Sequence, residues 1–333
     1  MKIYIYKGGL SIVRKSGVGK AMEHQERMLR ECQAPLAQSW KEATVVHLNT
    51  VFPDSVLVAL LAKLQKKKVV FYGHSTMEDF KNSFICSNFF APLFKKWIRF
   101  CYSLGDVILT PTEYSKQLLE GYGMKKPIYS ITNGVDTGFF SNDREAGQRF
   151  REKYGIAKDD KVVISAGHLI KRKGILDFLE LAKQMPDVTF VWFGGCHSFW
   201  IPREIKEAMQ SRSDNVIFAG YVNAVDLKGA YSGADCFAFF SYEETEGIVV
   251  LEALACEIPL IVREIPVYET WLEDGREVYK ATTIKQYKEK LQEIFSSDQT
   301  ELLQRGRKLA KEHGMFQTSE RLNEIYQREQ LAE

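Results

Sequence analysis

Two glutamates and a glycine in the second half of this sequence are the residues best suited to chemistry. Glu244 and Glu252 are separated by seven residues, Gly247 lies between them, and the segment from 248 to 255 is otherwise apolar. This apolar run predicts a buried helix that begins just after Gly247. A helix N-terminus can bind an anion, because its first N–H groups are unpaired and lie at the positive end of the dipole. Glu252 is then a buried carboxylate that needs a partner, for which a ligand hydroxyl is one candidate.

The two acids and the glycine resemble a known family signature. Glu244, seven residues and Glu252, with Gly247 and a following helix, are similar to the E-x7-E motif of retaining glycosyltransferases with the GT-B fold. The resemblance implies that Glu244 lies at the donor sugar and that Glu252 accepts hydrogen bonds from ribose hydroxyls. It also implies that the helix N-terminus at Gly247 and Ile248 holds the donor diphosphate. An amphipathic helix with a solvated glutamate is the alternative, because two acids at a fixed spacing are common.

A basic loop earlier in the second half adds to the resemblance. Gly167-His168 stands where the family has Gly-Arg, and Lys173-Gly174 matches the Lys-Gly of the family. The resemblance implies that Lys173 neutralises the donor diphosphate. His168 replaces the family's arginine, so Arg172 or Lys171 is a candidate for that role. Lysines of such a loop are otherwise usually solvated.

Two further segments match the same family in the same order. The resemblance implies that the backbone around Gly220 and Tyr221 faces the uracil. The segment from Asn133 to Phe140 contains N-G-V-D followed by Phe, a turn former between the two halves. The donor-binding residues predicted in the second half are therefore His168, Arg172, Lys173, Gly220, Tyr221, Glu244, Gly247, Ile248 and Glu252.

The first half contributes two candidate segments. Gly17 and Gly19 begin a helical segment ahead of Lys20 and let backbone amides approach a donor closely, although a tight turn without ligand is the alternative. His74 follows an apolar strand, and doubly wound sheets bind ligands at the carboxyl ends of strands. Its imidazole can accept or relay the acceptor proton near neutral pH, or it can cap the next helix. The predicted catalytic residues are Glu244, Lys173 and His74.

An aromatic and basic segment from Asn88 to Leu104 predicts an interfacial helix. At about 100° per residue its large apolar side chains share one broad face, and Lys95, Lys96 and Arg99 lie on the opposite side. Such a helix suits an anionic membrane surface, and the lysines at 66–68 add attraction. A helix packed on its own sheet with a solvated basic edge is the alternative. The predicted membrane-binding residues are Phe94, Lys95, Lys96, Trp97, Arg99 and Phe100.

Composition limits the class of protein. The chain has 333 residues, 45% hydrophobic and 26% charged, with a net charge of +2, which favours two folded domains and no nucleic-acid partner. Its six cysteines form no C-x-x-C pair, which predicts buried thiols in a reducing compartment, and no histidine cluster predicts a metal site or cofactor. With no signal region and no apolar run of membrane-spanning length, we expect a cytoplasmic protein. The cysteines are Cys32, Cys86, Cys101, Cys196, Cys236 and Cys256.

Short β-branched and aromatic runs alternate with helix-length segments twice along the chain, which predicts an α/β protein with two parallel sheets. Together with the resemblance, this predicts the GT-B fold, with two Rossmann-like domains facing across a cleft. We expect an acceptor-binding domain at 1–140, completed by a C-terminal helix at 315–333, and a nucleotide-sugar-binding domain at 160–314, after a polar boundary at 141–160. The predicted strands are 2–6, 44–48, 69–72, 107–110, 128–131, 162–166, 188–193, 216–219, 236–240 and 260–262.

The segments around Gly17, His74 and the aromatic helix resemble the bacterial diglycosyldiacylglycerol synthases. This resemblance implies retaining transfer of galactose from a UDP-sugar to monoglucosyl diacylglycerol at the inner face of the cell membrane, for glycolipid and lipoteichoic acid anchor synthesis. No D-x-D pair is evident in the sequence to bring a metal ion, so we expect the reaction to be metal-independent. The nucleophile stays open, and direct front-face displacement with the leaving phosphate as base fits that gap. The alternatives are a diacylglycerol glucosyltransferase, a surface polysaccharide transferase, a noncatalytic sugar-nucleotide-binding membrane protein and a nucleotide sugar epimerase.

Overall fold

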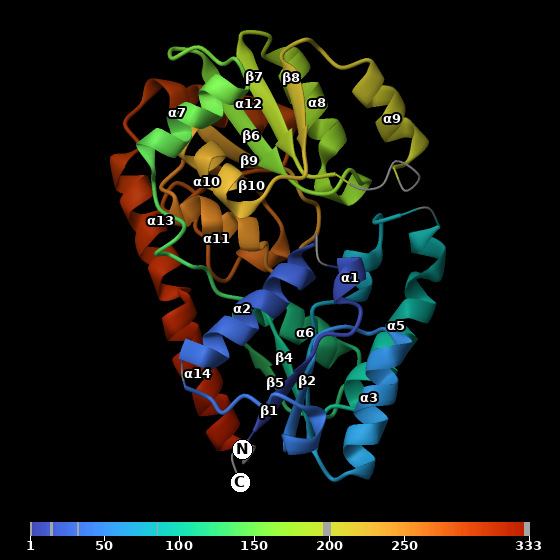
Figure 1. The fold of residues 1–333 in the computed structure, drawn as a ribbon. Helices are drawn as coiled ribbons and strands as arrows, with labels where there is room; N and C mark the ends of the chain where they lie inside the picture. Colours follow the sequence, from blue (N-terminus) through green and yellow to red (C-terminus); the bar gives the residue numbers. More distant parts are fainter. Residues whose placement is uncertain (1, 14–15, 32, 85, 196–200, 330–333) are drawn as a thin grey trace.

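The computed structural model describes residues 2–13, 16–31, 33–84, 86–195 and 201–329, which form two α/β domains stacked one above the other (Figure 1). The first domain holds a five-stranded parallel sheet whose order follows the sequence. Parallel neighbours need a crossover segment between them, and helices supply it here. The strands are β1 (Ile3–Tyr6), β2 (Val45–Leu48), β3 (Lys68–Tyr72), β4 (Val107–Thr110) and β5 (Ile128–Ser130).

The second domain holds a six-stranded parallel sheet in the order β11-β10-β9-β6-β7-β8. Its strands are β6 (Lys161–Ala166), β7 (Val188–Phe193), β8 (Val216–Gly220), β9 (Cys236–Phe239), β10 (Leu260–Arg263) and β11 (Tyr279–Ala281). Each predicted strand agrees with an observed one to within one residue at either end. Among the strands of the described residues, β11 alone was not predicted; it is a three-residue edge strand with a lysine at its centre.

Helices cover both faces of each sheet, as buried parallel strands require (Figure 1). In the first domain they are α1 (Leu10–Val13), α2 (Gly17–Glu31), α3 (Pro53–Leu64), α4 (Met77–Phe80), α5 (Ser87–Ser103) and α6 (Glu113–Gly121). Those that follow are α7 (Arg144–Lys153), α8 (Ile175–Gln184), α9 (Arg203–Gln210), α10 (Ala224–Gly233), α11 (Ile248–Ala255), α12 (Ile284–Ser296), α13 (Thr300–Glu312) and α14 (Met315–Arg328). None of these helices is long and apolar enough to cross a bilayer.

Aromatic side chains fill one of the two cores of the second domain. The ring of Phe178 in α8 packs edge-on against Phe190, Trp192 and Phe240, with centroids 5.5, 5.1 and 6.0 Å away. All four side chains are buried. Burying one such ring stabilises the fold by about 1.5–3 kcal/mol. This packing fixes the ends of β7 and β9, where the loops of the site begin.

The chain passes between the domains twice, and the two passes are joined. Val135, in the segment after β5, forms a backbone bridge with Gly314, just before α14. The amide of Val135 donates to the carbonyl of His313 at 3.1 Å, and the amide of Met315 donates to the carbonyl of Val135 at 3.2 Å. The connections between the domains therefore lie side by side.

Helix α14 returns to the first domain and packs beside α2 (Figure 1). Leu322, Ile325 and Tyr326 belong to the same hydrophobic core as β1 and β2. The Tyr326 hydroxyl lies 2.6 Å from Nε2 of the buried His47 on β2. The C-terminal helix expected at 315–333 thus lies on the first domain, and residues 330–333 of that expectation fall outside the described residues.

The polar segment at 141–160, expected as the domain boundary, contains α7. Asp143 caps this helix by accepting from the amide of Ala146 at 3.0 Å. Helix α7 packs against α10 so closely that a Cβ on Gly147 would lie 2.7 Å from the carbonyl oxygen of Ser232. The packing of the second domain therefore begins upstream of the residue 160 expected from the sequence.

The cysteines follow the sequence expectation in part. Cys101, Cys236 and Cys256 are buried free thiols, whereas Cys86 is exposed, so the expectation of burial is wrong for Cys86. Cys86 immediately precedes α5 and has a left-handed backbone, with φ at 64°, which places it on the surface at a turn. Cys32 and Cys196 lie outside the described residues.

Candidate active site

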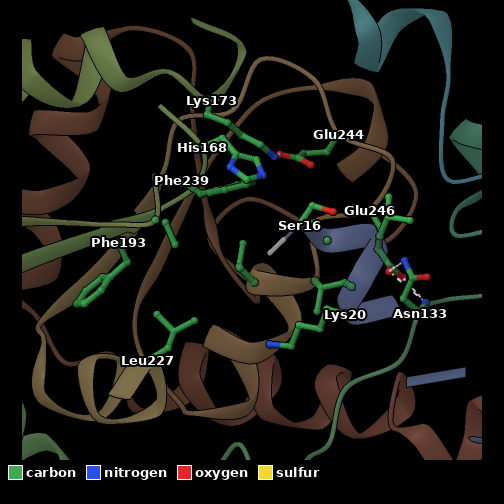
Figure 2. Close-up of a pocket in the computed structure, with 18 of the residues that line it drawn as sticks. Ser16, Lys20, Asn133, His168, Lys173, Phe193, Leu227, Phe239, Glu244 and Glu246 are labelled. Carbon is green, nitrogen blue, oxygen red and sulfur yellow. Dashed lines mark hydrogen bonds and ion pairs between the residues drawn. The ribbon is translucent and has the colours of Figure 1, made fainter. Parts of the chain in front are cut away.

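A cavity of about 540 Å³ lies between the two domains (Figure 2). Loops that follow β6, β7, β8 and β9 line it from the second domain, and the start of α2 with residues after β3 and β5 lines it from the first. The carboxyl ends of parallel strands are where ligands bind in such sheets. The predicted site residues that line it are Gly17, His74, His168, Arg172, Lys173, Tyr221, Glu244, Gly247 and Ile248.

Lys173 and Glu244 form a buried ion pair inside this cavity (Figure 2). Lys173 ends a 3-10 turn, and Gly174 follows with φ at 72°, where a side chain would overlap the backbone of Phe240. The ammonium also lies 5.6 Å from the centre of the Phe239 ring. Burial lowers the pKa of Lys173 from its ordinary value, although Glu244 opposes that shift. Burial acts to raise the pKa of Glu244, but the cations beside it outweigh burial and the pKa lies below its usual value.

His168 lies beside Lys173 and acts as a neutral hydrogen-bonding group. Its Nδ1 is 2.9 Å from the carbonyl oxygen of Gly195, to which Nδ1–H can donate. Burial lowers the pKa of His168 below its ordinary value. At neutral pH its imidazole therefore lacks the fixed charge of the arginine that the family has at this position.

Arg172 ties the second domain to the first. Its Nη1 donates to Oδ1 of Asp79 at 2.8 Å and to the carbonyl of Glu243 at 2.6 Å, and its Nε donates to the Ser83 hydroxyl at 3.0 Å. These partners occupy the guanidinium, although Arg172 lines the cavity as predicted. Its expected contact with a diphosphate stays a prediction. The other candidate, Lys171, pairs with Glu204 on the surface.

Helix α11 begins at the cavity, as predicted from its apolar run. Gly247 has φ at 87°, and a Cβ there would lie 2.8 Å from the Tyr268 hydroxyl, so this entrance to the helix requires glycine. Glu252 is fully buried, and its partner is Lys20 of α2, with the Tyr231 hydroxyl at 3.3 Å. This ion pair connects the domains, and it occupies the carboxylate expected to bind ribose.

His74 is held rigidly at the cavity wall. Its ring stacks on Tyr72 with centroids 4.4 Å apart, and its Nε2 lies 3.0 Å from Oδ1 of Asn49. The alternative that His74 caps the next helix is wrong, because Thr76 caps α4 by accepting from the amide of Asp79. Burial lowers the pKa of His74 to about 3, which makes the imidazole a weak proton acceptor. Holding a hydroxyl suits this group better than relaying its proton.

Glu246 is a buried acid of the site that the sequence analysis did not single out. It accepts from the Thr132 hydroxyl, from the amide of Asn133 at 3.1 Å and from Nδ2 of Asn133 at 2.7 Å (Figure 2). Burial raises the pKa of Glu246 to about 7, against the effect of these hydrogen bonds. Only its position between Glu244 and Gly247 could have drawn attention to it, since its partners lie in the other half of the chain.

The remaining predicted donor residues divide between the cavity and its surroundings. Gly17 begins α2 and lines the cavity, whereas Gly19 is buried in the first turn and does not. Tyr221 is exposed at the edge of the cavity, next to Gly220, which turns the chain with φ at 70° but does not line it. Among the described residues, no group of three His, Cys, Asp or Glu side chains is placed to hold a metal ion.

The predicted membrane helix α5 has two apolar faces instead of one. Ile98 and Cys101 point into the first domain, whereas Leu93 and Phe100 are exposed. The division arises because α5 packs on its own sheet, as the alternative interpretation expected, while leaving other large side chains outside. Of the predicted membrane-binding residues, Phe94 and Trp97 are half-buried, Lys96, Arg99 and Phe100 are exposed, and Lys95 lies over the Tyr122 ring at 4.4 Å.

Comparison with known proteins identifies the family. Residues 147–313 match the family described as Glycosyl transferases group 1, and residues 21–139 match Glycosyltransferase Family 4. The chain is 37% identical over 330 residues to the Processive diacylglycerol alpha-glucosyltransferase of Acholeplasma laidlawii, covering 98% of both chains. This chain belongs to the group 1 glycosyl transferases. The glycosyltransferase is also 29% identical over 248 residues to the Alpha-galactosylglucosyldiacylglycerol synthase of Streptococcus pneumoniae, covering 72% of this chain and 65% of that relative.

Solved structures share the fold of the glycosyltransferase. A crystal structure of Anabaena Alr3699/HepE in complex with UDP-glucose aligns with a TM-score of 0.77 at 15% identity, covering 98% of this chain and 100% of that chain. The sucrose-phosphate synthase of Thermosynechococcus elongatus aligns with a TM-score of 0.73 at 18% identity, over 87% and 74% of the two chains. These likenesses confirm the predicted GT-B fold. The resemblance to diglycosyldiacylglycerol synthases holds at the level of the family.

Proposed function

We propose that this glycosyltransferase moves a hexose from a UDP-sugar to a diacylglycerol lipid, with retention of the anomeric configuration and without a metal ion. The observation that carries the proposal is the buried Lys173–Glu244 pair beside the N-terminus of α11, inside a cavity that both domains line. A cation, a helix N-terminus and an acid at one place suit a sugar attached to a diphosphate.

The protein's own charges would stabilise the leaving diphosphate. Lys173 pairs with Glu244, and an incoming diphosphate competes for the same ammonium. One fixed charge about 4 Å away contributes on the order of 4 kcal/mol at an effective dielectric near 20. Once Lys173 turns to the phosphate, the Glu244 carboxylate is free to accept from sugar hydroxyls. With these roles for Lys173 and Glu244, the proposed reaction needs no metal ion. Transfer activity that persists in excess EDTA would support this.

Retention is proposed through front-face displacement. Glu252 is held within α11 by Lys20 and Tyr231, so it is not paired with Glu244 as the two acids of a glycosidase are. The leaving phosphate then takes the proton of the acceptor hydroxyl. His74, which is neutral at physiological pH, holds that hydroxyl on the other side of the cavity.

Glucose is the donor sugar that the comparisons favour. The relative that matches nearly the whole chain is named a glucosyltransferase, whereas the relative named a galactosylglucosyl synthase is less similar and covers less of the chain. We therefore propose UDP-glucose as the donor, and the galactose expected from the sequence stays a prediction. The proposed acceptors are monoglucosyl diacylglycerol and bare diacylglycerol. A role in lipoteichoic acid anchor synthesis also stays a prediction.

Peripheral attachment to the inner face of an anionic membrane is the proposed location. Helices α3 and α5 lie on the same flank of the first domain (Figure 1). Both expose large apolar side chains. Phe89 on α5 and Leu64 on α3 are each 80% exposed, and Lys96 and Arg99 of α5 are also exposed. The leucines of α3 at 57, 60, 61 and 64 share one helix face that the sequence analysis did not consider. Rings and leucines in the acyl boundary with cations among headgroups suit such a surface.

The test combines donor and acceptor in one experiment. The protein is incubated with UDP-glucose or UDP-galactose and anionic vesicles, with and without monoglucosyl diacylglycerol or diacylglycerol, and UDP release is measured. We expect lipid-dependent release with UDP-glucose and an α-linked product by NMR. Release that ignores the lipid, or a β-linked product, would overturn the proposal. Tight binding of the UDP-sugar without any release of UDP would favour the noncatalytic alternative.

A further inference from the structure

An apolar groove of about 640 Å³ runs between α4 and α5, outside the reaction cavity. Two of its lining residues are Phe80 and Phe94, whose rings stack with centroids 4.1 Å apart and an interplanar angle of 15°. Lys96 is the one cation among the described side chains that line it. The other lining residues are Phe90, Leu93, Trp97 and Phe100.

Neighbouring residues of α4 line the groove and the reaction cavity. Asp79 lines the cavity, and the next residue, Phe80, lines the groove. Consecutive Cα atoms are only about 3.8 Å apart, so the groove and the cavity approach each other at this short helix. Arg172 holds this turn against the second domain through Asp79 and Ser83. These contacts place α4 beside the domain that carries Lys173 and Glu244.

We infer that this groove binds one acyl chain of the lipid acceptor while its polar head lies in the reaction cavity. The inference rests on the proposed function. An alkyl chain has no polar groups, so it loses no hydrogen bonds in a groove of aromatic and aliphatic side chains. A peptide there would leave backbone N–H and C=O groups unpaired, which is costly. Protruding side chains such as Phe89 are sufficient for contact with a bilayer. A concave groove beside the cavity can in addition hold a single acyl chain.

The test uses acceptors that are monomeric in water, so that no bilayer takes part. Glucosyl glycerols that carry one acyl chain of two to eight carbons are used below their micelle concentrations, with UDP-glucose as donor. We expect kcat/KM for the acceptor to rise about fourfold per methylene, the factor that corresponds to about 0.8 kcal/mol per buried CH₂. KM for the donor stays unchanged.

Variants of exposed phenylalanines separate the groove from other apolar surface. Phe90 and Phe100 line the groove and are each 47% exposed, so Phe90→Ser/Phe100→Ser is expected to fold and to flatten the dependence on chain length. Phe316 is an exposed phenylalanine of α14 that does not line the groove, so Phe316→Ser is the matched control and keeps the slope. A flat slope in the wild type, or an unchanged slope in the double variant, overturns the inference.

Binding is measured as well, so that the result does not depend on turnover. Trp97 lines the groove, and its fluorescence should change as the longer-chain acceptor is added; Trp97→Phe should lose that change. Affinity that does not increase with chain length overturns the inference even if no transfer occurs. The vesicle experiment distinguishes failure of the proposed function. If that function is wrong, the protein releases no UDP from the UDP-sugar with any of the lipids. Dimerisation of the chain in place of acceptor binding, detected by sedimentation and lost in the double variant, also overturns the inference.

Discussion

Replacing Lys173 with methionine tests the charge at the centre of the site. The substitution keeps most of the side-chain volume and removes the ammonium. A unit charge about 4 Å from the diphosphate contributes on the order of 4 kcal/mol at an effective dielectric near 20, or roughly a thousandfold in rate. The N-terminus of α11 remains and retains part of this stabilisation. We therefore expect Lys173→Met to lower kcat/KM by about a hundredfold or more.

A loss of stability accompanies this change and has to be separated from it. Lys173 and Glu244 are both largely buried, and removing one partner of a buried pair costs about 3–5 kcal/mol. Arg172 Nη1, 3.9 Å from Glu244 Oε2, offsets part of that cost. The double variant Lys173→Met/Glu244→Gln leaves no unpaired charge. We expect it to recover stability in urea unfolding without recovering activity.

The assay is lipid-dependent UDP release, measured beside the free energy of unfolding for each variant. Lys171→Met is the matched control, because Lys171 belongs to the same turn but pairs with Glu204 on the surface. It should retain kcat/KM within about twofold, since exposed pairs contribute little. A Lys173→Met variant with activity close to that of wild type would remove this residue from the diphosphate site and refute the electrostatic reasoning.

Three further predictions concern contacts between domains and with the membrane. Lys20→Met should lower the free energy of unfolding by about 1–3 kcal/mol, because the buried Glu252 carboxylate loses its cation. The effect is moderate because Lys20 is partly solvated. Adding Glu252→Gln should restore the free energy of unfolding, as measured by urea unfolding. The pKa of Glu246 is raised to about 7 in the folded protein, from 4.5 in the unfolded chain. The protonated carboxyl therefore contributes stability that is fully present below pH 4.5 and is lost as the pH rises to about 7. Glu246→Gln should therefore remove a decline of about 3 kcal/mol over that window, and identical pH profiles would contradict this. Phe89→Ser/Leu64→Ser should weaken sedimentation with anionic vesicles at least tenfold while leaving transfer to monomeric acceptors unchanged, and equal vesicle binding would exclude that surface.

The sequence predicted the parts of the site that local pattern determines. Apolar runs located the strands, and the spacing of Glu244, Gly247 and Glu252 located α11 and its N-terminus. Lys173 was found because its motif is contiguous with a strand end. All of these signals lie within a few residues of the feature they predict.

The contacts between domains could not be predicted in the same way. Lys20 and Glu252 are 232 residues apart, and nothing local to either residue indicates the other. Asp79 lies in a one-turn helix whose partner, Arg172, was expected at a phosphate. Helix α5 was predicted with one apolar face because periodicity cannot distinguish side chains that pack on a sheet from those that face outward. Such assignments depend on the tertiary fold.

The bridge between Val135 and Gly314 limits how the glycosyltransferase can open. Two chain segments joined by backbone hydrogen bonds bend together more easily than they twist or slide past each other. We therefore expect the two domains to open by a hinge motion about a single axis through this bridge. Substrates would then enter from the edge opposite this hinge. Each opening would break the Lys20–Glu252 pair and the Arg172–Asp79 pair together.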